Sequence, residues 1–167
     1  ILGRTRDDAA GESFDKVAKM LKLGYPGGPI IEAKARFGDP NSHRFPRALL
    51  EKESLDFSFS GLKTSVRNLL TKRERGEQLD ISDADISAGF QEAVIDVLVT
   101  KLMRACKEEE LKRIVVTGGV AANGALRERV MLAGKERGMK TYFPKPVYCT
   151  DNAAMIACAG YYRCRNN

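Results

Sequence analysis

The chain has 167 residues, enough for a single large domain with its own hydrophobic core. Its 28 basic and 22 acidic residues give a formal net charge of +6, which suits an RNA or nucleotide partner. No apolar run approaches the roughly 20 residues of a membrane span, and no secretory signal precedes the polar residues 4–8. The four cysteines lack the spacing of a zinc knuckle. We therefore expect a soluble, cytoplasmic protein with free thiols and no membrane partner.

The first half of the chain predicts short helices joined by turns. The chain begins at Ile1 without a methionine, and its first three residues resemble the end of a strand, so we expect upstream strands to be missing. Pro29 suits the first position of a helix, and alternating apolar residues after Ser54 indicate a half-buried strand. The expected elements are a helix over 11–24, a turn over 25–29, a helix over 30–38, a strand over 55–63 and a helix over about 62–73.

The second half alternates helices and strands. Ser82 and Asp85 have the spacing of a capping box, which opens the longest helix. A buried strand over 112–119, a helix from Asn123, a strand over 141–146 and a C-terminal helix follow. This alternation predicts an α/β fold with crossover connections. Two strands are too few for a covered sheet, so we expect the sheet in this chain to be incomplete.

The segment GGVAANGALR, residues 118–127, follows the predicted buried strand directly. Gly118 and Gly119 would let a ligand approach the backbone at the end of that strand, and the next helix would offer free N–H groups. Asn123 could then contact an adenine edge or a sugar hydroxyl. An ordinary turn with Asn123 as the helix N-cap explains the same residues.

The segment YPGGP is open to the same two interpretations. Gly27 and Gly28 suit a tight turn, or a backbone packed against a flat ligand with Glu32 as an acceptor for ribose hydroxyls. Asp15 is either a solvated residue of its helix or a second ribose acceptor.

Asp151 precedes the apolar C-terminal helix, where it could be an N-cap or a metal ligand. Zinc sites use three or four protein donors, and His43 is the only histidine in the chain. Asp151 therefore cannot form a complete metal site alone. A basic cluster follows the predicted strand over 55–63 and is either a solvated face or an RNA-phosphate contact; it comprises Lys63, Arg67, Lys72, Arg73 and Arg75.

Four segments together resemble one family in order and spacing. They are DDAAGESFDKVAKMLKLGYPGGP, LDFSFSGLKTSVRN, VVTGGVAANGALR and CTDNAAMIACAG. The chain is similar over almost its whole length to the TsaD family, also called YgjD, Gcp or O-sialoglycoprotein endopeptidase.

The resemblance implies a second lobe of RNase H-like fold from the actin-like ATPase superfamily. Residues 1–80 would form a helical nucleotide-binding region and 81–167 the alternating part, without the N-terminal lobe. Asp15, Gly28, Glu32 and Asn123 would contact the adenosine part of threonylcarbamoyl-AMP or ATP. Asp151 would cap its helix and be one ligand of iron or zinc. The family's HxxxH segment, which supplies two further metal ligands, has no counterpart here.

The implied activity is transfer of the threonylcarbamoyl group to N6 of the tRNA adenosine 3′ of the anticodon, with this chain alone inactive. The implied partners are tRNA and TsaB-like and TsaE-like subunits, and we expect a dimer through unpaired strand edges. Two alternatives remain: a non-catalytic nucleotide-binding or assembly module, and a metallopeptidase acting on O-sialoglycoproteins.

Overall fold

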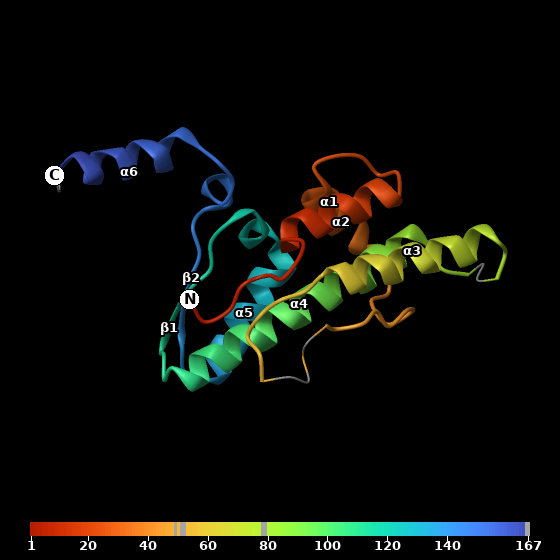
Figure 1. Ribbon diagram of the computed structural model, residues 1–167, viewed down its shortest axis with the longest axis horizontal. Coiled ribbons are helices and arrows are strands. Elements are labelled where there is room, and N and C mark those ends of the chain that lie inside the picture. Colours follow the sequence, from red (N-terminus) through yellow and green to blue (C-terminus); the bar gives the residue numbers. More distant parts are fainter. Residues whose placement is uncertain (49, 51–52, 78–79, 166–167) are drawn as a thin grey trace.

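The computed structural model describes residues 1–48, 50, 53–77 and 80–165. These residues form six α-helices and one small parallel sheet, joined by loops and 3-10 turns, in an α/β arrangement (Figure 1). The helices are α1 (Ala10–Met20), α2 (Gly27–Ala35), α3 (Ser60–Glu74), α4 (Asp83–Glu108), α5 (Gly124–Glu136) and α6 (Ala153–Arg165). The strands are β1 (Arg113–Val115) and β2 (Lys140–Tyr142), and the 3-10 turns are η1 (Gly119–Ala122) and η2 (Pro146–Tyr148).

The long helix α4 joins two hydrophobic cores. Its N-terminal half packs with α1, α2 and α3 around Phe14 and Phe90. The centroids of these two rings lie 5.1 Å apart in an edge-to-face arrangement. The C-terminal half of α4 packs with α5 and β1 around Val99, Ile114 and Val130. The predicted capping box is confirmed: Ser82 Oγ accepts from the Asp85 N–H, and the Asp85 carboxylate accepts from the Ser82 N–H.

The sheet is smaller than the sequence predicts. Strands β1 and β2 pair in parallel over three residues each, with Ile114 opposite Thr141. The strand predicted over 112–119 is confirmed only as the shorter β1, and the prediction that it is buried is wrong, because only Ile114 of β1 is buried. The strand predicted over 141–146 ends at Tyr142, two residues before Pro144, which has no N–H to donate to a ladder.

The strand predicted over 55–63 is also wrong. Phe57 makes a single bridge to Thr5, and no ladder extends it. The Asp7 carboxylate accepts hydrogen bonds from the N–H groups of Phe59 and Ser60, so the backbone turns there into α3. The helix predicted over 62–73 is confirmed as α3, two residues earlier at its start.

Helix α2 begins earlier than Pro29, the predicted first position. The Asp15 carboxylate accepts from the Gly27 N–H at 2.7 Å, and both glycines belong to the first turn. The turn predicted over 25–29 therefore ends at Pro26. The predicted strand end at Ile1 is wrong too: described residues 1–4 lie in no strand.

Helix α6 stands apart from the rest of the molecule in Figure 1, and none of its residues is buried. Among the described residues, no helix is both long and apolar enough to span a membrane.

Candidate functional site

A cavity of about 840 Å³ lies where the two cores meet, and most of its lining is apolar. Its walls come from α1, the start of α2, Phe57, the middle of α4, the segment from Val115 to Asn123, and α5. Four residues that the sequence singled out all line this cavity: Asp15, Gly28, Glu32 and Asn123. The fold thus brings together residues up to about a hundred positions apart. Their role as ligand contacts stays a prediction.

The two carboxylates of the cavity each hold the N-terminus of a helix. Asp15 Oδ1 accepts from the first N–H of α2, that of Gly27, at 2.7 Å. Glu32 Oε1 accepts from the first N–H of α5, that of Gly124, at 3.0 Å, and lies 3.6 Å from Arg36. Helix N-termini carry unpaired N–H groups and favour negative charge, so both carboxylates are held where they are stabilised. Within the described residues, the second oxygen of each carboxylate has no hydrogen-bond partner.

Asn123 is the N-cap of α5, as the ordinary-turn interpretation predicts. Its Oδ1 accepts from the Leu126 N–H at 2.9 Å, and its Nδ2 donates to Gln91 Oε1 at 2.8 Å. The side chain is almost fully buried. Asn123 can therefore both cap α5 and line the cavity, because the cap holds its side chain at the cavity wall.

Three glycines leave space in the cavity. A Cβ at Gly28, Gly118 or Gly119 would meet no described atom within 4 Å. At Gly118, φ is +93°, a value that side chains rarely adopt. These positions therefore present bare backbone to the cavity, which lets a flat group approach the chain closely.

The charges of the cavity indicate what it would accept. Asp15 and Glu32 are the charged side chains in its described lining, and no Lys or Arg belongs to it. Carboxylates accept hydrogen bonds from hydroxyl and amino groups, and apolar walls suit a planar ring. The lining therefore matches a nucleoside better than a phosphate chain.

Arg127 and Gln91 support the site, and the sequence analysis did not identify either residue's role. Arg127 donates to the carbonyls of Ala121, at 2.9 Å, and Pro144, at 2.7 Å, which ties the loop before α5 to the chain after β2. These two carbonyls lie six and 17 residues from Arg127 along the chain, so helical spacing could not have identified its role. The pairing of Gln91 with Asn123 joins separate helices and leaves no local signal either.

Asp151 lies outside the cavity lining, and its prediction as a helix cap is wrong. Asn152 caps α6 instead: its Oδ1 accepts from the Met155 N–H at 2.9 Å. Asp151 itself is exposed. Across the described ranges, no three His, Cys, Asp or Glu side chains come together to hold a metal ion. The residues that the structure describes therefore do not by themselves fit iron or zinc, and the assignment of Asp151 as one ligand stays a prediction.

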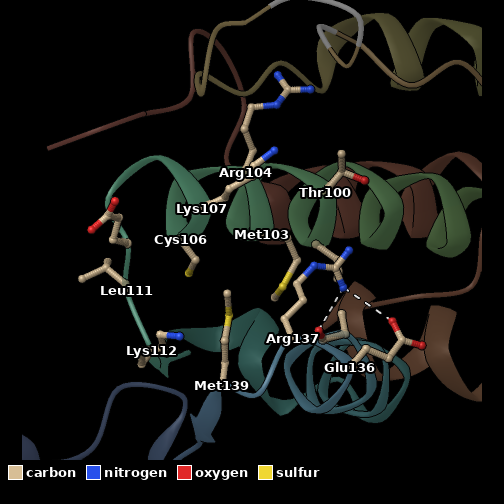
Figure 2. Close-up of a pocket in the computed structure, with 13 residues that line it drawn as sticks. Thr100, Met103, Arg104, Cys106, Lys107, Leu111, Lys112, Glu136, Arg137 and Met139 are labelled. Carbon is tan, nitrogen blue, oxygen red and sulfur yellow. Dashed lines mark hydrogen bonds and ion pairs between the residues drawn. The ribbon is translucent and has the colours of Figure 1, made fainter.

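A second cavity, of about 880 Å³, lies between the C-terminal ends of α4 and α5 (Figure 2). Met103, Cys106 and Met139 contribute to it, and burial raises the pKa of the Cys106 thiol. Arg137 donates to the Ala133 carbonyl at 3.0 Å and lies 3.5 Å from Glu136. Cations are favoured at helix C-termini, which accounts for Arg137 and Lys107 without a ligand. None of the predicted site residues lies in this cavity.

The basic cluster after Phe59 is partly neutralised. Lys63 pairs with Asp8, and Arg73 lies 2.7 Å from Asp83. Arg67, Lys72 and Arg75 are exposed.

Comparison with known proteins identifies the family. The profile of the TsaD family, described as tRNA N6-adenosine threonylcarbamoyltransferase, matches residues 1–158. The chain is similar to proteins of that name from several bacteria. The chain is 54% identical over 164 residues to the one from Desulfitobacterium hafniense, covering 98% of the chain and 48% of the relative. It is 53% identical over 163 residues to the one from Moorella thermoacetica, covering 98% and 47%.

The relative from Clostridium beijerinckii is 50% identical over 162 residues, with 97% of the chain and 48% of the relative covered. The chain thus spans about half the length of the curated relatives it matches. A family match over nearly the whole chain, at about half identity, leads to one conclusion: this chain belongs to the TsaD family.

Proposed function

We propose that this chain forms part of a tRNA N6-adenosine threonylcarbamoyltransferase. The observation that carries the proposal is the cavity, which gathers Asp15, Gly28, Glu32 and Asn123 from two helices, α1 and α2, and from the loop before α5. The family membership supplies the reaction: threonylcarbamoyl transfer to N6 of a tRNA adenosine. The chain spans about half the length of these relatives, so the activity of the whole protein is itself part of the proposal.

The cavity would hold the adenosine part of threonylcarbamoyl-AMP or ATP. Asp15 and Glu32 would accept hydrogen bonds from the ribose hydroxyls through their second carboxylate oxygens. Gly28, Gly118 and Gly119 would let the adenine ring lie against bare backbone. Binding the non-reacting nucleoside in this way would position the donor group for attack.

The remaining features of the proposal follow from the family. Residues 1–80 and 81–167 would be the helical nucleotide-binding part and the alternating part of an RNase H-like lobe. The partners would be tRNA, TsaB-like and TsaE-like subunits, and a second copy of the chain in a dimer. Arg67, Lys72 and Arg75 have the exposure that tRNA phosphates would require. Any iron or zinc would need ligands besides Asp151 from elsewhere in the protein.

The proposal is tested by a modification assay. The intact protein, with its partner subunits, tRNA and threonylcarbamoyl-AMP, should form N6-threonylcarbamoyladenosine. Glu32→Gln keeps an oxygen acceptor for the Gly124 N–H but removes the charge, and we expect it to reduce product at subsaturating donor. The exposed control Glu74→Gln should leave product formation unchanged. Nucleotide binding without product would favour the non-catalytic module, and absence of both would refute the proposal.

A further inference from the structure

Lys101 is a buried cation in the middle of α4. Its side chain is 1% exposed. Nζ donates to the carbonyl oxygen of Ser54 at 2.9 Å and to that of Asp56, both backbone groups. Burial lowers the pKa of this ammonium, and Arg104 adds to the effect. A buried charge costs free energy that neutral carbonyls only partly offset, so a lysine here calls for a reason beyond packing.

The segment that Lys101 holds, residues 54–57, has two hydrogen-bonding edges. On one edge, Phe57 donates its N–H to the Arg4 carbonyl and accepts from the Arg6 N–H, both at 2.9 Å. In an extended chain, carbonyls two residues apart point to the same side. Those of Ser54 and Asp56 therefore lie on the opposite edge, where a further strand would pair. The ammonium of Lys101 occupies that edge instead.

This segment also forms part of the cavity wall. Phe57 lines the cavity, together with Leu98 and Leu102, the neighbours of Lys101 on α4. Nζ of Lys101 lies 5.6 Å from the centroid of the Phe57 ring, a cation–π distance. The ring itself stacks beside that of Phe59, with centroids 6.3 Å apart. One side chain thus links the backbone of the segment, its aromatic ring and the helix behind it.

We propose that Lys101 is a positioning residue for the cavity: it closes the free edge of residues 54–57 and thereby holds the Phe57 ring in the wall. Its effect on a ligand rests on the proposed nucleotide function, whereas its effect on the segment does not. No ladder fixes residues 54–57, since the bridge from Phe57 to Thr5 is isolated. Removing the ammonium would leave the carbonyls of Ser54 and Asp56, on two half-buried residues, without this donor and would loosen the ring.

The test compares Lys101→Met, which keeps the chain length but removes the donors, with Lys101→Arg, which keeps a cationic donor. Lys107→Met, on an exposed turn of the same helix, is the matched control. Amide hydrogen exchange of Phe57 and Arg6 reports the segment directly. Calorimetry with ATP reports the cavity.

We expect Lys101→Met to speed exchange of the Phe57 and Arg6 amides at least tenfold, and to weaken ATP binding about tenfold. The α5 amides should keep their exchange rates. Lys101→Arg should keep most of the exchange protection at Phe57 and Arg6 and most of the ATP affinity. Lys107→Met should change neither quantity. Unchanged exchange at Phe57 in Lys101→Met would overturn the proposal. If the unsubstituted protein binds no ATP, the nucleotide function fails while the exchange result still decides the role of Lys101.

A second variant covers the case in which Lys101→Met does not fold. Phe57→Leu removes the ring and leaves the ammonium and both carbonyls in place. The proposal expects weaker ATP binding with Phe57→Leu and no faster exchange at Arg6. If Phe57→Leu speeds exchange of the Arg6 amide as much as a general loss of stability would, Lys101 does not hold the segment, and the proposal is contradicted.

Discussion

Asp7, Asp15, Glu32 and Asn123 each accept a hydrogen bond from a backbone N–H in the first turn of a helix. Only the cap by Asn123 is local, three residues from its donor, and the sequence predicted it. Asp7 lies 53 residues from Ser60, and Glu32 lies 92 residues from Gly124. Such pairs depend on how helices pack, so no local pattern announces them. The cap of α6 by Asn152 is local as well, but Asp151 and Asn152 are adjacent and both residue types favour the N-cap, so the sequence could not decide between them.

Replacing Asn123 by Ala should lower the free energy of unfolding by about 1 kcal/mol, the usual value of an N-cap. The loss of the Gln91 contact adds to this, because a buried amide is left without its partner. Asn123→Asp is the control, since its carboxylate can still cap α5. Urea unfolding of both variants gives the measurement. Equal stability of Asn123→Ala and the unsubstituted chain would show that the cap contributes nothing.

Asp7 makes the stability of the chain sensitive to acid. Burial alone would raise its pKa, but hydrogen bonds from Ser58, Phe59 and Ser60 outweigh it and lower the pKa to about 2. A carboxyl with a depressed folded-state pKa stabilises the fold above its unfolded value, 3.8, and this contribution is lost as pH falls toward 2. The urea concentration at the midpoint of unfolding should therefore decrease as the pH is lowered from about 4 to about 2. In Asp7→Asn the decline should be shallower; an identical pH profile would remove Asp7 from this account.

At the scale of elements, the sequence predicted each of the six described α-helices and located β1 and β2, but it made both strands too long and added a strand over 55–63. Apolar periodicity and the Ser82 capping box are local signals, and they located α1, α3 and α4. A strand needs a partner, which local alternation cannot supply, so residues 55–63 read as a strand although Phe57 forms only one bridge. The start of α2 was missed for a related reason: the carboxylate that holds it comes from α1.

Gly27 and Gly28 are adjacent but serve different purposes. A Cβ at Gly27 would lie 2.5 Å from the Asp15 Cα, so Gly27→Ala should separate α1 from α2 and destabilise the fold by roughly 1–3 kcal/mol. A Cβ at Gly28 would meet nothing within 4 Å. Gly28→Ala should therefore keep stability and weaken nucleotide binding. Thermal unfolding and ATP calorimetry of the pair separate the roles, and equal stability losses would contradict this assignment.

Helix α6 carries apolar residues on several sides, and Met155, Ile156, Tyr161 and Tyr162 are each at least 50% exposed. An unsupported helix of 13 residues is marginally stable in water. We expect its amides to exchange much faster than those in the core of α4 when the chain is dilute. Protection that grows with protein concentration would support the dimer. Protection equal to that of α4 at every concentration would contradict the isolated helix.

At the scale of the whole molecule, two cores meet along α4, and the cavity forms at their junction. The sequence predicted the four residues Asp15, Gly28, Glu32 and Asn123 as a group through family resemblance. Their hydrogen-bond partners and the apolar walls came only from the fold, since residues from both halves of the chain build them. The carboxylates and apolar walls of the cavity suit the nucleoside that we propose as its ligand.

The most direct measurement of the central claim is an NMR titration of the labelled protein with ATP and with a threonylcarbamoyl-AMP analogue. We predict that the amide signals of Gly28, Gly118 and Gly119 shift in a saturable way with both ligands. Those of Leu111 and Met139, which line the second cavity, should not move. Shifts confined to Leu111 and Met139, or no saturable shift at the three glycines, would contradict the assignment of the nucleotide to the cavity between the cores.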